Sequence, residues 1–62
     1  MQIDVEVENH GSIMIFQPLT VIARDWLEDN TDGQWWAGGL AVEPCYAEDL
    51  AEGLIGEGFT VA

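Results

Sequence analysis

The sequence contains no lysine and a single arginine, Arg24, against 12 aspartates and glutamates, which gives a formal net charge of -11. Such a surface repels the phosphates of nucleic acids and the head groups of anionic membranes. Direct binding to DNA, RNA or a membrane is therefore the class of function that the composition excludes most firmly. The same field attracts basic protein surfaces and accelerates encounter with them.

Cysteine is equally scarce, since Cys45 is the only one in the chain. An internal disulfide and a cysteine-based zinc cage are both excluded. A lone thiol is typical of a reducing compartment, so we expect a cytoplasmic protein. A thiolate nucleophile needs a neighbouring base, and nothing in the pattern supplies one. We therefore interpret Cys45 as a packing residue, buried or half-buried in a helix.

Long apolar runs are missing as well. No uncharged stretch reaches the length of a membrane-spanning helix, about 20 residues, and residues 1–4 do not have the composition of a signal peptide. The 62 residues are expected to form one domain, residues 1–62. At this size stability is marginal and self-association is a common way to increase it. A homodimer is therefore one open alternative.

Apolar and acidic side chains alternate within residues 2–8. This period of two predicts a half-buried β-strand. Residues 9–12 have the composition of a turn, and an apolar second strand is expected over residues 12–17. The chain therefore opens with a hairpin whose first strand presents Asp4, Glu6 and Glu8 on one face.

Two registers of this hairpin are open. A short turn at residues 10–11 places Ile13 and Ile15 on the acidic face of the sheet, whereas a longer, bulged turn places Met14 and Phe16 there. In either register, two large apolar side chains share a face with carboxylates. Either another element of the fold covers them, or they form an amphipathic docking patch with an acidic rim.

Two helices are predicted further along the chain. Thr20 is the expected N-cap of the first, which ends near Asn30 and contains a possible ion pair between Arg24 and Glu28. Pro44 suits the first position of the second helix, and a glycine at position 56 suits its end. The expected core faces comprise Ile22, Ala23, Trp26 and Leu27 in the first helix, and Tyr46, Ala47, Leu50, Leu54 and Ile55 in the second.

A third strand is expected at residues 40–42, within the apolar stretch 35–43, and a short last strand at residues 59–61. The predicted fold class is α+β, with the order ββαβαβ. Right-handed crossovers place both helices on one face of a small mixed sheet, which gives a two-layer sandwich. The other face of the sheet is left open and carries the acidic side chains of the first strand.

Two of the three tryptophans, Trp35 and Trp36, are consecutive. In a strand they point to opposite faces, so one enters the core and the other is at least partly exposed. The exposed one either covers the open face within the monomer or anchors a partner. The candidate interaction surface comprises Asp4, Glu6, Glu8, Ile13, Ile15, Trp35 and Trp36.

Catalytic and metal-binding patterns are weak. His10, the only histidine, lies in the predicted turn, and pairing it with Ser12 supplies neither an orienting acid nor an oxyanion site. Residues 28–33 resemble the start of a calcium-binding loop, but the last position of that loop falls on Gly39 in place of a bidentate glutamate. A domain this small rarely encloses a deep pocket. We expect no enzyme, no cofactor and no metal site.

Several short motifs follow one another in order. They are Asn-His-Gly-Ser at 9–12, Pro-Leu-Thr at 18–20, Ala-Arg-Asp-Trp-Leu at 23–27, Trp-Ala-Gly-Gly at 36–39 and Ala-Val-Glu-Pro at 41–44, followed by Tyr46 and Gly-Phe at 58–59. In this series the chain resembles a family of small uncharacterised bacterial proteins, many of them associated with phages and prophages. The family pattern implies an arginine where this chain has Cys45. The resemblance implies an association with mobile elements and no site residues.

Two functions are compatible with these features. The first is a non-enzymatic protein-interaction domain whose partner is a basic or amphipathic protein surface, or a second copy of the chain. The second is a phage-type nucleic-acid mimic that blocks a host DNA-binding protein, with carboxylates in the place of phosphates. A solvated acidic face that only keeps the protein soluble is the simplest alternative to mimicry.

Overall fold

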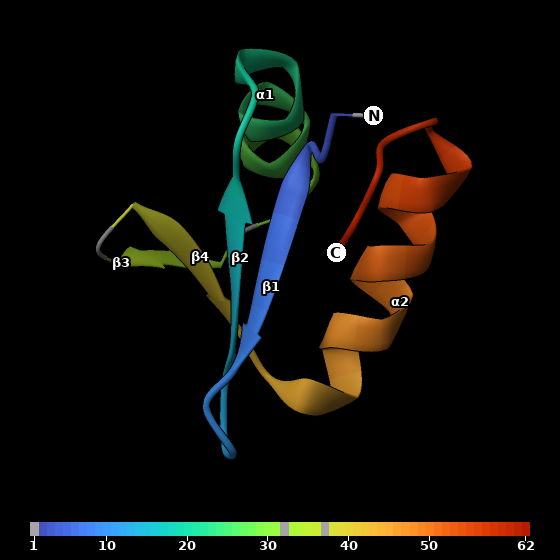
Figure 1. The fold of residues 1–62 in the computed structure, drawn as a ribbon. Coiled ribbons are helices and arrows are strands. Elements are labelled where there is room, and N and C mark those ends of the chain that lie inside the picture. Colours follow the sequence, from blue (N-terminus) through green and yellow to red (C-terminus); the bar gives the residue numbers. More distant parts are fainter. Residues whose placement is uncertain (1, 32, 37) are drawn as a thin grey trace.

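The computed structural model describes residues 2–31, 33–36 and 38–62. The elements are β1 (Val5–Asn9), β2 (Met14–Pro18), α1 (Val21–Asn30), β3 (Gln34–Trp36), β4 (Gly39–Val42) and α2 (Pro44–Gly56). The strands form one 4-stranded sheet in the order β1-β2-β4-β3, and neighbouring strands are antiparallel (Figure 1). The expected α+β class is confirmed.

Although neighbouring strands are antiparallel, each helix connects two segments that run parallel to each other, as expected. β2 and β3 are both antiparallel to β4, which lies between them, so α1 connects two parallel strands. Val61 forms an isolated parallel bridge with Val5, so α2 likewise leads from β4 to a segment beside β1. In Figure 1 the C-terminus lies between β1 and α2. The predicted order ββαβαβ is retained, with the last strand reduced to this bridge and with β3 added.

The first hairpin turns one residue later than the expected short turn at residues 10–11, and Val7 lies opposite Phe16, a pairing that neither open alternative gave. The His10 N–H donates to the Ile13 carbonyl at 2.9 Å, so residues 11–12 form the loop, and Gly11 has a φ of 84°. A glycine adopts this left-handed conformation without the steric cost that a Cβ brings. Glu8 lies opposite Ile15 in the resulting register. The two isoleucines therefore share the acidic face, as the short-turn alternative requires.

Residues 35–43, predicted to contain one strand, form most of a second hairpin. Gly38 has a φ of 85°, and Trp36 pairs with Gly39 across the turn. The apolar stretch was long enough for two short strands, and the paired glycines mark the turn between them. β3 thereby becomes an edge strand, paired with β4.

One face of the sheet and both helices enclose the core. The buried residues that form it are Val5, Phe16, Ala23, Leu27, Leu40, Val42, Ala47, Leu50 and Leu54. Because α1 and α2 both contribute, they cover the same face, as predicted. Trp26 and Phe59 extend the core by an edge-to-face contact with ring centroids 6.2 Å apart.

The local signals of α1 and α2 are confirmed. The Thr20 hydroxyl accepts a hydrogen bond from the Ala23 N–H at 3.2 Å, which caps the first turn of α1. Arg24 Nε lies 3.3 Å from Glu28 Oε1. Pro44 begins α2 and Gly56 ends it.

Three of the predicted core positions on the helices are wrong. Ile22 is 72% exposed, Ile55 is 60% exposed and Tyr46 is 47% exposed. Successive helical residues are rotated by about 100°, so the buried stripes centred on Ala23 and Leu54 leave their neighbours Ile22 and Ile55 facing solvent. The stripes are narrower than the apolar composition of the helices suggests.

Candidate interaction surface

The face of the sheet opposite the helices is not covered by any helix or strand in the described part of the chain. Side chains alternate along each strand, so the pairing register assigns this face directly. We call it the open face; its residues are Glu6, Glu8, Ile15, Gln17, Gln34, Trp36, Gly39 and Ala41, together with His10 and Ile13 beside the first turn. Five of these ten were not among the candidate residues.

Trp35 and Trp36 point to opposite sides of β3, as the alternation predicts. Trp35 packs against the core, and the guanidinium of Arg24 lies 5.1 Å from the centroid of its ring. Trp36 is 65% exposed and belongs to the open face. The sequence left open which of the two is exposed, and the strand register decides it.

Ile15 is almost buried although it lies on the open face, with 5% of its surface exposed. A Cβ placed on Gly39 would lie 2.5 Å from Ile15 Cγ2 and 3.1 Å from Gln17 Cγ. The side chains of β2 therefore lean into the space that the glycine of β4 leaves free. Glycine in a strand often marks such a close approach.

A hollow of about 390 Å³ lies on the open face. Its lining residues are His10, Ile13, Ile15, Gln34, Trp35, Trp36 and Ala41. On β4 the outward residue that lines this hollow is Ala41, whose small side chain leaves the space between the larger residues of β2 and β3 unfilled. The result is a shallow apolar depression with an exposed tryptophan at its edge.

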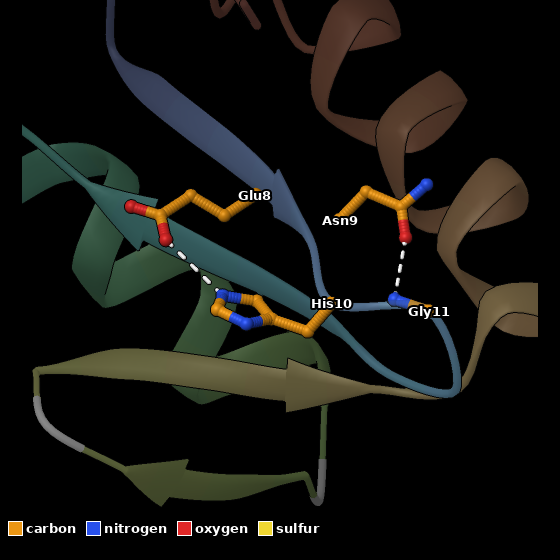
Figure 2. Close-up of polar contacts among 4 residues, drawn as sticks. All are labelled: Glu8, Asn9, His10 and Gly11. Atoms are coloured by element: carbon orange, nitrogen blue, oxygen red, sulfur yellow. Dashed lines mark hydrogen bonds and ion pairs between the residues drawn. The ribbon is translucent and has the colours of Figure 1, made fainter.

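Carboxylates flank this depression from β1. Glu6 and Glu8 are both exposed, and Glu8 Oε2 lies 3.1 Å from His10 Nε2. Figure 2 shows Glu8 and His10 facing each other on one side of the hairpin, while the Asn9 side chain points to the other side. There its Oδ1 accepts a hydrogen bond from the Gly11 N–H at 2.8 Å, which supports the turn.

Asp4, although part of the alternating pattern, is occupied elsewhere. Its Oδ2 accepts a hydrogen bond from the Thr60 N–H at 2.9 Å, and its own N–H donates to the Thr60 carbonyl at 2.9 Å. Its carbonyl accepts from the Leu19 N–H at 2.7 Å. Asp4 therefore holds the C-terminal residues beside the start of β1 by hydrogen bonds. We do not count it among the residues of the open face.

Cys45 is exposed, so its predicted burial is wrong. It follows Pro44 in the first turn of α2, whereas the buried residues of this helix are Ala47, Leu50 and Leu54. Its Sγ lies 3.7 Å from Glu43 Oε2.

A second hollow, of about 410 Å³, lies where the loop after α1 meets the start of α2. Its lining residues are Thr31, Gly33, Ala41, Val42, Glu43 and Tyr46. Across the described residues, no three His, Cys, Asp or Glu side chains are grouped to hold a metal ion. Asp32, which took part in the calcium-loop comparison, lies outside the described residues.

The sequence did not predict a second exposed apolar cluster at the start of α1. Leu19 is 51% exposed, Val21 75% and Ile22 72%. The helical pattern had placed Ile22 in the core. For the open face, the missed signal is the small residue at position 41, which a strand assignment places in the floor of a depression.

The fold and this surface define a small α+β domain with one covered and one open sheet face. Comparisons with family models, with curated proteins and with solved structures give no match. The resemblance to prophage-associated proteins stays a prediction. No helix in the described ranges is long and apolar enough to cross a membrane.

Proposed function

We propose that this chain is a non-enzymatic protein-interaction domain that binds its partner through the open face. The observation that carries the proposal is Trp36, a 65% exposed tryptophan at the edge of an apolar depression. Tryptophan is enriched among the residues that contribute most to binding energy, and such residues cluster around pockets. The depression gives a partner side chain a place to be buried beside the indole ring.

The surroundings of Trp36 have the composition of an interface. Ile13, Ile15 and Ala41 form an apolar centre, and Glu6 and Glu8 form a polar edge. An apolar centre with a polar rim is typical of protein–protein contacts. The exposed cluster at the start of α1 is also apolar, but none of its residues lines either of the two hollows described above, and we do not assign it to the same role.

Site-specific photocrosslinking in the cells that make the protein tests the proposal. A photoreactive amino acid at Gln34, which lines the depression, should capture a partner. The same group at Asp49, exposed on α2, is the control position. Trp36→Ala should abolish the products of position 34. Ile55→Ala, which removes another exposed apolar side chain, should leave them unchanged.

The crosslinks also separate self-association from binding to a different protein. A product with twice the mass of the chain indicates a second copy, and other masses identify a partner by peptide sequencing. The proposal is abandoned when positions 34 and 49 give the same products, or when Trp36→Ala leaves the products of position 34 intact.

Nucleic-acid mimicry is the alternative proposal, supported by the net charge of -11. On the open face, however, the exposed carboxylates of β1 are only Glu6 and Glu8, and Glu8 is already hydrogen-bonded to His10. The exposed Trp36 on β3 favours an apolar contact instead. Duplex DNA should displace the captured partner if the chain is a mimic, and should leave it bound if the apolar depression dominates the contact.

A further inference from the structure

We infer that the partner seated on the open face is a basic amphipathic segment of another protein, with a large apolar side chain in the depression and a lysine or arginine on Glu6 or Glu8. The inference rests on the proposed function and names the partner's chemistry. It follows from the placement of charge around the depression.

The depression and the carboxylates are arranged side by side on the sheet. The floor is on β4, and Glu6 and Glu8 are on β1, with β2 between them. Two strand spacings separate β4 from β1 by roughly 10 Å. A segment lying along β4 can therefore reach the carboxylates with a long side chain that crosses β2, which is a property of lysine and arginine.

Nothing in the chain neutralises these carboxylates fully. Arg24 is the only lysine or arginine, and its guanidinium is engaged with Trp35 and Glu28, away from the open face. His10 contacts Glu8 but is itself half exposed. Glu6 lies opposite the uncharged Gln17. Among the described residues no lysine or arginine faces Glu6 and Glu8, so a basic partner would meet uncompensated negative charge here.

The same charges oppose a symmetric homodimer through the open face. A two-fold interface brings the same patch of both copies together. Such an interface would bring together two molecules that each carry a net charge of -11. Like charges placed across an interface cost binding energy, whereas a basic segment gains from the same field.

Titration of the labelled full-length protein with three synthetic peptides tests the inference by NMR. The probes are a short peptide that alternates lysine and leucine, one that alternates lysine and serine, and one that alternates glutamate and leucine. The first should shift the amide signals of Ile15, Gln34 and Trp36, and should bind about tenfold more tightly than either control. Raising the salt concentration from about 0.05 M to about 0.5 M should weaken this binding strongly.

Two pairs of charge variants provide a matched comparison. E6Q combined with E8Q removes two charges beside the depression, whereas E48Q combined with E52Q removes two charges from exposed positions of α2. The first pair of substitutions should weaken binding of the lysine–leucine peptide about fivefold or more. The second pair should have little effect on that binding. Circular dichroism of each variant confirms that it is folded.

The outcomes separate this inference from the proposed function. The inference of a basic partner would be overturned if both pairs of charge variants lost the same affinity for the lysine–leucine peptide. It would also be overturned if the glutamate–leucine peptide bound as tightly as the lysine–leucine peptide. A dimer in sedimentation experiments that strengthens with salt and is lost in Trp36→Ala would overturn it too, but would leave the open face as an interaction surface. Failure of the proposed function itself would appear as absence of Trp36-dependent crosslinks at position 34.

Discussion

The two faces of the sheet are made by the same strands and differ in almost every property. On the covered face, Val5 and Leu40 are 0% exposed and Phe16 is 1% exposed. On the open face, Trp36 is 65% exposed and the acidic residues of β1 remain in solvent. Adjacent residues in one strand can therefore be subject to different demands, one for stability and the next for recognition.

Ile15 and Gly39 stand between these extremes. Both lie on the open face, yet both are buried, because the isoleucine of β2 fills the space above the glycine of β4. Part of the open face is therefore already buried within the monomer. Its stable part is the contact between β2 and β4, and its exposed parts are the carboxylates of β1 and the tryptophan of β3.

Phe16→Ala should have the largest effect, because it removes a fully buried aromatic side chain from the covered face. Truncation of a buried phenylalanine costs about 3–5 kcal/mol, which is comparable to the whole stability of many small domains. We expect the variant to be largely unfolded by circular dichroism. Its neighbour Gln17 is the control, since Gln17→Ala alters the open face and should leave the protein folded.

Gly39→Ala should have the next largest effect. The new Cβ would lie 2.5 Å from Ile15 Cγ2, a branched atom close to its own backbone that cannot swing away. Overpacking of this kind costs about 1–3 kcal/mol, measurable by urea denaturation. Gly56→Ala is the control because nothing lies within 4 Å of its Cβ. Equal stability of the two variants would show that Ile15 does not depend on the glycine.

Asp4→Ala should have a smaller effect, confined to one end of the molecule. It removes the acceptor of the Thr60 N–H, worth about 1 kcal/mol for a partly buried hydrogen bond, and loosens the contact of the last residues with β1. Hydrogen exchange at the Thr60 amide should become faster, with little change at Phe16. Glu57→Ala removes the same charge from an exposed position and should leave that exchange rate unchanged.

The sequence could predict the features that depend on local chemistry. Thr20 caps α1 and Pro44 starts α2 because each depends on residues close in the chain. For the same reason the acidic alternation predicted a strand at residues 2–8, of which residues 5–8 lie in β1. The short-turn register also assigned Ile15 to the acidic face, even though the loop itself is shifted by one residue. These local rules were enough to give the α+β class.

What could not be predicted depends on contacts between distant segments. Ile22 and Ile55 fit an apolar stripe in their helices, but the packing of the helices on the sheet leaves both side chains in solvent. The depression arises because Ala41 of β4 lies between β2 and β3. The order of strands in a sheet depends on contacts between segments, so no single segment of the sequence predicts it. Asp4 was read as a surface carboxylate because its partner, Thr60, lies at the other end of the chain.

Trp36→Ala should have the smallest effect on stability, which makes it the sharpest test of the contrast between the faces. The side chain is mostly exposed, so we expect a change within about 0.5 kcal/mol in the free energy of unfolding. Trp35→Ala, at the next position, removes a ring that packs against the core and lies 5.1 Å from the Arg24 guanidinium. It should cost about 1–3 kcal/mol.

Denaturant titrations of the two tryptophan variants, monitored by circular dichroism, measure this difference within one strand. If the covered face serves stability and the open face serves recognition, Trp36→Ala keeps the fold and loses the crosslinks at position 34, while Trp35→Ala lowers the free energy of unfolding more than Trp36→Ala does. A large loss of stability in Trp36→Ala would mean that its indole closes the depression within the monomer. The residue would then be a lid on Ile15 and Ala41, and the open face would lose its anchor.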